Sequence, residues 1–129
     1  MTLDTVWRVR RDGIVMSEQQ VLNQIMYFLE TIPHISFWRQ NNVGVFDARQ
    51  GCYRKSNSKF SRLGISDIIG VIKGGRILCI EVKSPERYRS GLSSAQKSFL
   101  EDINKFGGLA FAACSAKQVE KILIEEGII

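Results

Sequence analysis

The chain is poor in the residues that build disulfide frameworks and zinc sites. Its 129 residues include three cysteines, two prolines and one histidine. Cys52, Cys79 and Cys114 lie far apart and form no C-x-x-C pair, which argues against a structural zinc site and predicts buried thiols at Cys79 and Cys114. The single histidine, His34, follows a proline and is assigned no role. This cysteine usage fits a reducing cytoplasm.

The sequence also lacks the features of a membrane or exported protein. No apolar run approaches the length of a membrane span, and the first four residues, Met-Thr-Leu-Asp, lack the basic and then apolar character of a signal peptide. We therefore expect a cytoplasmic protein with no membrane partner. A hydrophobic content of 44% and a charged content of 24% are ordinary for a globular chain. With no repeat and no low-complexity linker, residues 1–129 are predicted to form one domain.

Positive charge is concentrated in one segment. The net charge is +5, and residues 39–62 hold six basic side chains against the single acid Asp47. Asparagine, serine, glycine and aromatic residues lie between them, a mixture suited to a DNA phosphate backbone. A solvated basic loop that only aids solubility explains the composition equally well. The candidate DNA-binding residues here are Arg39, Asn41, Arg54, Lys55 and Arg62.

Helix caps and apolar patterns predict an α/β fold. Serines at 17, 93 and 115 are each followed by glutamine three residues later, which is the spacing of a capping box, so each predicts a helix start. Strands are expected within 35–47, near 65–72, near 76–83 and at 109–114, with an arm at 1–16 and a long excursion at 48–64. The order is α-β-β-β-α-β-α, with a mixed sheet flanked by helices.

Alternation along the two central strands predicts where their polar side chains meet. In residues 76–83 one face carries Leu78, Ile80 and Val82, and the other becomes charged at Glu81 and Lys83. If Lys73-Gly74-Gly75 is a three-residue loop, Ile72 pairs with Arg76 and Asp67 falls opposite Glu81. A two-residue loop would shift the register by one and separate the acids. We predict the three-residue loop.

Two opposed carboxylates and a lysine suit metal-assisted phosphodiester hydrolysis. Both acids stay ionised only when a cation lies between them, and Mg²⁺ binds through one or two carboxylates, waters and substrate phosphate. Lys83 shares the face of Glu81 and can orient or deprotonate an attacking water. The alternative is an exposed hairpin with solvated charges, but the apolar residues at 68–69 and 78–80 argue against it.

Two helices supply further candidates. Glu18 extends the apolar stripe of the first helix, so we expect it to assist a cation, although a glutamate in a first turn also favours the helix dipole. Gln96 lies on the apolar stripe of the second helix. It is predicted to contact phosphate or the catalytic lysine, with capping alone as an equal alternative.

Five motifs lie in a characteristic order along the chain: Trp38-Arg39-Gln40-Asn41, Gly64-Ile65-Ser66-Asp67-Ile68-Ile69-Gly70, Gly75-Arg76 running into Ile80-Glu81-Val82-Lys83-Ser84, Leu92-Ser93-Ser94-Ala95-Gln96 and Gly107-Gly108-Leu109-Ala110. In this order they resemble the VRR-NUC (virus-type replication-repair nuclease) family of the PD-(D/E)XK nuclease superfamily. The likeness covers about residues 17–125, and the chain has Ser66 where the superfamily label has proline.

The resemblance implies a restriction-endonuclease-like core and Mg²⁺- or Mn²⁺-dependent DNA hydrolysis. By that likeness Asp67, Glu81 and the main-chain carbonyl of Val82 ligate metal, Glu18 assists, and Lys83 serves catalysis. Stand-alone chains of this size are similar to phage-encoded enzymes that cut branched DNA as homodimers, which would place this one in a bacterial host cytoplasm.

Three functions stay open on the sequence. The leading interpretation is an endonuclease for four-way (Holliday) junctions or other branches. A nicking or restriction-like enzyme on duplex DNA has the same chemistry, and a non-catalytic DNA-binding module has the same fold. Two-fold symmetry would give a homodimer two equivalent sites. Candidate interface residues are Val6-Trp7-Arg8-Val9 and Ile128-Ile129.

Overall fold

The fold is that of a computed structural model, which describes residues 16–40, 45–54 and 59–129; for residues 45–47 and 52–54 only the backbone is described. A four-stranded sheet in the order β1-β4-β5-β6 forms the centre. Its strands are β1 (Ser36–Arg39), β4 (Ile68–Ile72), β5 (Arg76–Val82) and β6 (Leu109–Ala113). The first three are antiparallel neighbours, and β6 runs parallel to β5. The predicted mixed sheet and α/β class are confirmed.

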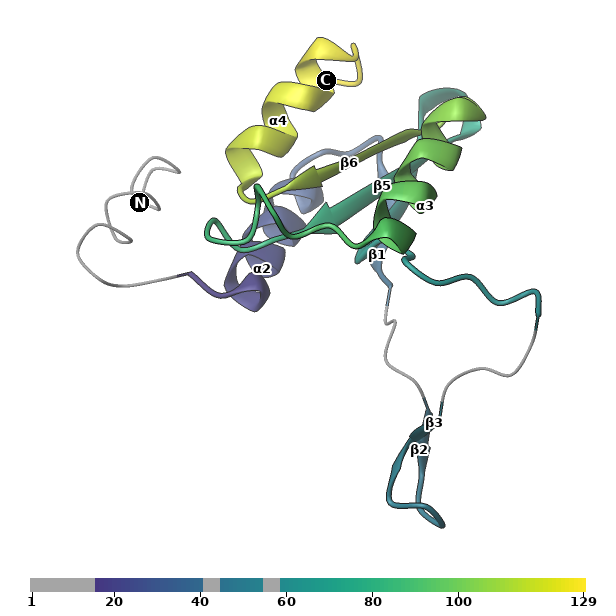
Figure 1. The fold of residues 1–129 in the computed structure, drawn as a ribbon. Helices are drawn as coiled ribbons and strands as arrows, with labels where there is room; N and C mark the ends of the chain where they lie inside the picture. Colours follow the sequence, from purple (N-terminus) through teal and green to yellow (C-terminus); the bar gives the residue numbers. More distant parts are fainter. Residues whose placement is uncertain (1–15, 41–44, 55–58) are drawn as a thin grey trace.

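Three helices cover the two faces of this sheet (Figure 1). Helices α2 (Glu18–Glu30) and α4 (Ala116–Glu125) pack on one face, where Ile25, Leu78 and Val119 belong to the larger core cluster. Helix α3 (Ser94–Lys105) packs on the other face, where Cys79 and Phe99 belong to a smaller cluster. Successive side chains of β5 therefore enter different cores, as its alternation predicts.

Each helix begins at its predicted serine. The hydroxyl oxygens of Ser17, Ser93 and Ser115 accept hydrogen bonds from the main chain three residues later, all at 3.1 Å. The capping box is complete in α2 and α3. In α4 the box is incomplete, because the Gln118 side chain accepts from the Cys114 N–H at 2.7 Å. Cys79 and Cys114 are buried, as predicted.

The strand expected within 35–47 divides into two. Strand β1 stops pairing with β4 at Arg39, where the Gln40 N–H donates to the Asp67 carbonyl at 2.7 Å. The next described strand, β2 (Val45–Asp47), pairs with β3 (Cys52–Arg54) in a separate hairpin. Figure 1 shows this hairpin apart from the main sheet. The expected arm at residues 1–16 lies almost wholly outside the described residues.

Within the described ranges, no helix combines the length and the apolar character that crossing a membrane requires.

Candidate active site

The hairpin between β4 and β5 has the register that the sequence predicts. Ile72 pairs with Arg76 and Ile68 with Ile80, across the three-residue turn Lys73–Gly75. Two positive backbone angles close this turn, φ 84° at Gly74 and 77° at Gly75, and glycine adopts such angles without steric cost. One residue beyond the last pair, the same register sets Asp67 opposite Glu81.

Asp67 is fixed by the strand that it faces. Its Oδ2 accepts a hydrogen bond from the Val82 N–H at 2.8 Å. In an antiparallel ladder the N–H and C=O of one residue point toward the same neighbouring strand, and the Lys83 N–H donates to Ala113 on the opposite side. The carbonyl of Val82 therefore lies on the edge of β5 that faces Asp67.

The Glu81 carboxylate is buried, with one oxygen bound and the other without a partner. The residue is 3% exposed. Its Oε1 accepts a hydrogen bond from Gln96 Nε2 at 2.9 Å and lies 4.0 Å from Lys83 Nζ. Its Oε2 is buried and has no hydrogen-bond partner. Because an unsatisfied buried oxygen is costly, this atom marks a place for a cation or a proton.

The electrostatics of the site favour the proton when no cation is present. Burial, followed by the charge of Asp67 and by the hydrogen bond that a protonated Glu81 can donate to Asp67, raises the pKa of Glu81 to about 8, with a smaller contribution from Glu18. Lys83 opposes this rise. Two acids that share one site cannot both ionise readily. A divalent cation would reverse the preference and stabilise the ionised pair.

The oxygens present suit a hard divalent cation. Asp67, the free Oε2 of Glu81 and the carbonyl of Val82 are oxygen donors, and Mg²⁺ commonly uses one or two carboxylates and fills its other positions with water. The described residues hold no group of three or more histidine, cysteine, aspartate and glutamate side chains that would enclose a metal. Because all the donors named above are oxygens, they fit Mg²⁺ or Mn²⁺ better than zinc, which favours sulfur and nitrogen ligands.

Comparison with known proteins identifies the family of the chain. The model of the VRR-NUC domain family matches residues 16–118, most of the chain and all the acids described above. The chain belongs to the VRR-NUC family. No curated protein and no solved structure gave a match. Membership indicates a nuclease-type, DNA-processing function, and VRR-NUC nucleases are generally dependent on divalent metal.

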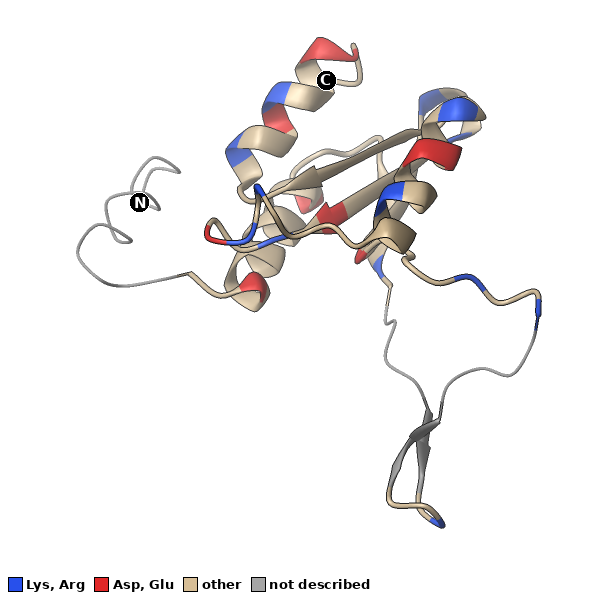
Figure 2. Ribbon diagram, in the orientation of Figure 1, with Lys and Arg blue, Asp and Glu red and all other residues tan. Residues whose placement is uncertain are grey.

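Glu18 is the first residue of α2, and among the residues that the structure describes it does not join Asp67 and Glu81 in a group of three acids that could hold a metal. It is partly buried and lines a pocket of about 210 Å³ together with Ser84 and Arg87. Figure 2 shows acidic positions at the start of α2 and at the end of β5, with basic positions on the loop that follows β5. The charge of Glu18 contributes to the raised pKa of Glu81. Its role as a ligand remains a prediction.

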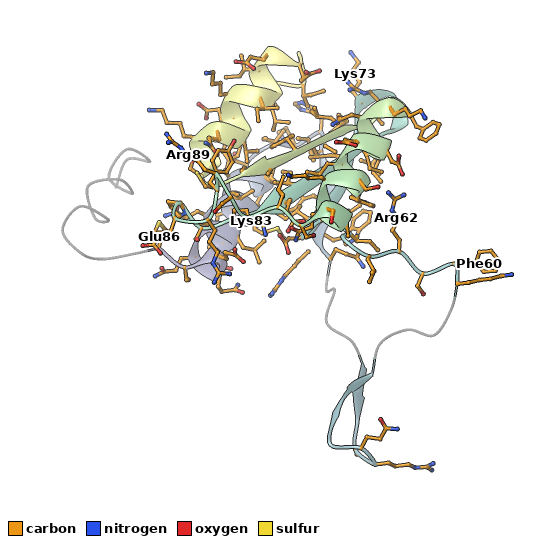
Figure 3. The ribbon with its side chains drawn as sticks, in the orientation of Figure 1. Phe60, Arg62, Lys73, Lys83, Glu86 and Arg89 are labelled. Atoms are coloured by element: carbon orange, nitrogen blue, oxygen red, sulfur yellow. The ribbon has the colours of Figure 1, made fainter. Side chains whose placement is uncertain are left out.

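Lys83 is the buried cation of the site (Figure 3). It is 8% exposed. A Cβ placed on Gly91 would lie 3.2 Å from its Cδ, so the loop after β5 packs closely against its aliphatic part. A packed lysine stem with its ammonium beside Glu81 is held in one place, as a catalytic group requires.

Of the DNA-binding residues predicted between positions 39 and 62, the structure describes the side chains of Arg39 and Arg62, which have different partners. Arg39 is exposed at the end of β1 and donates to Gln19 Oε1 at 3.4 Å. Arg62 is held by α3: its guanidinium lies 2.6 Å from Asp102 Oδ2 and 5.2 Å from the centre of the Phe99 ring. Of the others, Asn41 and Lys55 lie outside the described residues and Arg54 is described by its backbone alone.

Gln96 has a partner that the sequence analysis missed. Its side-chain oxygen accepts from the Ser93 N–H at 2.9 Å, while its side-chain nitrogen donates to Glu81. Capping and a contact in the site are therefore both present, and the contact is with the acid, where phosphate or lysine was expected. The apolar stripe placed Gln96 near the sheet, but it gave no sign of which polar atom lay opposite.

Proposed function

We propose that this VRR-NUC chain is a divalent-metal-dependent, structure-selective endonuclease that hydrolyses phosphodiester bonds in branched DNA, four-way junctions above all. The observation that carries the proposal is the buried, unpartnered Oε2 of Glu81 beside Asp67, at the strand end where Lys83 is also buried. A surface hairpin with solvated charges would have no such atom.

The roles follow from the positions of the groups. Asp67, Glu81 and the Val82 carbonyl would hold Mg²⁺ or Mn²⁺, with Glu18 assisting. The bound ion would supply positive charge at the scissile phosphate. Lys83 can orient the attacking water and donate to a phosphate oxygen as negative charge develops there. Gln96 binds one oxygen of Glu81, so the other oxygen would be available to the ion.

The DNA backbone would lie along the basic positions between Arg39 and Arg62. Arg39 is exposed beside α2 and can reach a phosphate by exchanging its long hydrogen bond with Gln19. Asn41, Arg54 and Lys55 are proposed on their sequence positions. Arg62 pairs with Asp102 of α3, but 41% of its side chain is exposed, so it can also donate to a phosphate.

Symmetric cleavage of a junction calls for two sites, and the described residues of one chain form a single candidate site. A homodimer with two-fold symmetry would supply the second site. Of the interface residues expected from the sequence, Val6-Trp7-Arg8-Val9 lies outside the described residues. Ile128 packs against the core of its own chain, and Ile129 is 42% exposed. Sedimentation equilibrium tests the homodimer, and a strictly monomeric active protein would contradict it.

The decisive experiment compares DNA substrates at a fixed Mn²⁺ concentration. A four-way junction, a flap and a linear duplex of the same sequence are incubated with the protein, and the initial rates are compared. We expect cleavage of the junction, loss of activity in EDTA, and at least 10-fold slower cutting of the duplex. Equal or exclusive cleavage of the duplex would contradict the branch preference, and cutting at one fixed sequence would favour a restriction-like enzyme.

A further inference from the structure

The segment before β4 contacts α3 and β5 within a few residues. At its start, Arg62 forms the ion pair with Asp102 in α3. At its end, Asp67 accepts the hydrogen bond from Val82 in β5. Gly64 lies between these two anchors. The segment therefore joins the helix that carries Gln96 to the strand that carries Glu81.

The backbone of Gly64 packs against α3 with no room for a side chain. A Cβ built on it would lie 2.6 Å from the main-chain nitrogen of Gln96 and closer still to the carbonyl of Ala95. Ordinary van der Waals contact for such an atom begins at 3.4 Å. The opposing atoms are backbone in the first turn of α3, so they cannot rotate away as the end of a flexible side chain would. The backbone of Gly64 thus lies directly on the start of α3.

The contact between Gly64 and α3 affects the distance between Gln96 and Glu81. Gln96 Nε2 reaches Glu81 Oε1 at 2.9 Å, near the optimum for an N–H···O bond. A side chain at position 64 would displace α3 or the segment by roughly 1 Å, which is enough to break that bond. Displacements of this size can reduce catalysis on the order of 100-fold. Asp67, three residues further along, would move with the segment.

We propose that Gly64 is a positioning residue of this nuclease site: its close packing on the Ala95–Gln96 peptide holds the Gln96 amide on Glu81. The proposal rests on the function proposed above, because Gln96 acts by binding Glu81, and Glu81 is a proposed metal ligand. The competing explanation is that glycine is required at 64 only for its φ of 78°.

The turn at the other end of β4 offers a matched control. Gly74 has a φ of 84°, and a Cβ placed on it would meet nothing within 4 Å. Gly64→Ala and Gly74→Ala therefore introduce a similar backbone strain. Only Gly64→Ala introduces a steric conflict with α3. A difference between the two variants therefore measures the effect of the contact with α3 separately from the effect of the positive φ.

The test measures three properties of the wild type and both variants. Thermal unfolding reports the strain, calorimetric titration with Mn²⁺ reports the carboxylate site, and ¹⁵N NMR reports the Gln96 side-chain amide, assigned with Gln96→Ala. We expect Tm to fall in both variants, and further in Gly64→Ala, because its steric conflict with α3 adds to the backbone strain. Only Gly64→Ala should shift the Gln96 amide signal and weaken Mn²⁺ binding, by about 10- to 100-fold. Equal Mn²⁺ affinities and an unmoved Gln96 signal in Gly64→Ala would overturn the proposal.

A second variant keeps the test decisive if Gly64→Ala does not fold. Arg62→Ala removes the neighbouring anchor without inserting an atom, and we expect a two- to five-fold loss of Mn²⁺ affinity with a shifted Gln96 signal. An unchanged signal would count against the proposal. These readouts do not involve DNA, so the loss of a DNA contact could not produce them. Absence of DNA cleavage by the wild type would refute the proposed function. The Gln96 amide signal in Gly64→Ala would still test whether Gly64 positions Gln96.

Discussion

Helices α3 and α4 begin with the same pair of capping residues, but the two capping glutamines have different partners. Each has a serine N-cap and a glutamine three residues later. In α4 the Gln118 side chain accepts from the main chain of Cys114, a bond that stays within the local turn. In α3 the Gln96 side chain completes the capping box and also donates to Glu81, 15 residues away in sequence. The same local signal thus becomes part of a site only where a polar strand end lies opposite.

The difference comes from what each helix start faces. Ser115 and Gln118 lie just after β6, so the Gln118 side chain binds the main chain of the short connection between β6 and α4. The start of α3 is reached through the long loop after β5 and lies against both Gly64 and the end of β5. Capping therefore stabilises both helices, but only in α3 does the capping glutamine also contact a residue of the candidate site. Four predictions follow from this contrast.

The largest effect should come from removing the charge that α3 faces. Glu81→Gln keeps the shape and an acceptor for Gln96 but loses the negative charge that would hold a cation. We expect DNA cleavage in Mn²⁺ to fall on the order of 10³-fold or more, with DNA binding in EDTA at neutral pH retained, because metal-free Glu81, with its pKa raised to about 8, is already largely protonated. Lys73→Gln, at the far end of the hairpin, is the control. Wild-type turnover in Glu81→Gln would place the site elsewhere.

The next effect tests the helix starts directly. Gln96→Ala should lower Mn²⁺ affinity or cleavage about 10- to 100-fold, as is usual for groups that orient a metal ligand. Gln118→Ala and Gln20→Ala remove the equivalent glutamines of α4 and α2 and should leave both properties within two-fold of wild type. Titration calorimetry and initial rates measure them. Similar losses in all three variants would show that capping alone is responsible.

A smaller effect concerns the pH dependence of stability. With no metal, the pKa of Glu81 is raised from 4.5 to about 8 in the folded chain, so between these values the folded state binds more protons than the unfolded state. Stability in EDTA should therefore fall as the pH rises through this window, by roughly 1–3 kcal/mol. Urea unfolding at pH 5 and pH 8.5 measures the change.

Glu81→Gln supplies the control for this pH effect, because it removes the titrating group. Its stability should change less over the same window, and Mg²⁺ at pH 8.5 should restore stability to the wild type alone. Parallel pH profiles for the two proteins would contradict the assignment of the raised pKa to the site.

The smallest effect should come from the caps themselves. Ser93→Ala and Ser115→Ala each remove one hydrogen bond to the third residue of a helix, worth about 1 kcal/mol. We expect equal losses of unfolding free energy, with lowered cleavage in Ser93→Ala alone, because its Gln96 is less well held. Chemical denaturation and initial rates provide the comparison. A lower rate in Ser115→Ala would mean that cap loss acts through general loosening.

Much of the fold was predictable because its signals are local. Serine-glutamine spacing located all three helix starts, and alternation assigned the two faces of β5. Loop length fixed the register that sets Asp67 opposite Glu81. The strand expected within 35–47 was wrong in extent, since apolar and aromatic residues on both sides of Gln40 resemble one strand. Only the pairing of β1 with β4, which stops at Arg39, shows that the chain leaves the sheet there.

By itself, the sequence determined the order of the described helices and of the four main-sheet strands, because periodicity and turn chemistry depend on neighbours along the chain. It predicted the two acids and the lysine as a site, and it did not predict the separate hairpin of β2 and β3. The tertiary structure alone decided that one oxygen of Glu81 is bound by Gln96 and the other is left free. It also decided that Arg62 braces α3 and that Gly64 packs on the start of that helix. These facts depend on contacts between segments that the sequence does not place next to each other, and they are fixed only when both faces of the sheet are packed.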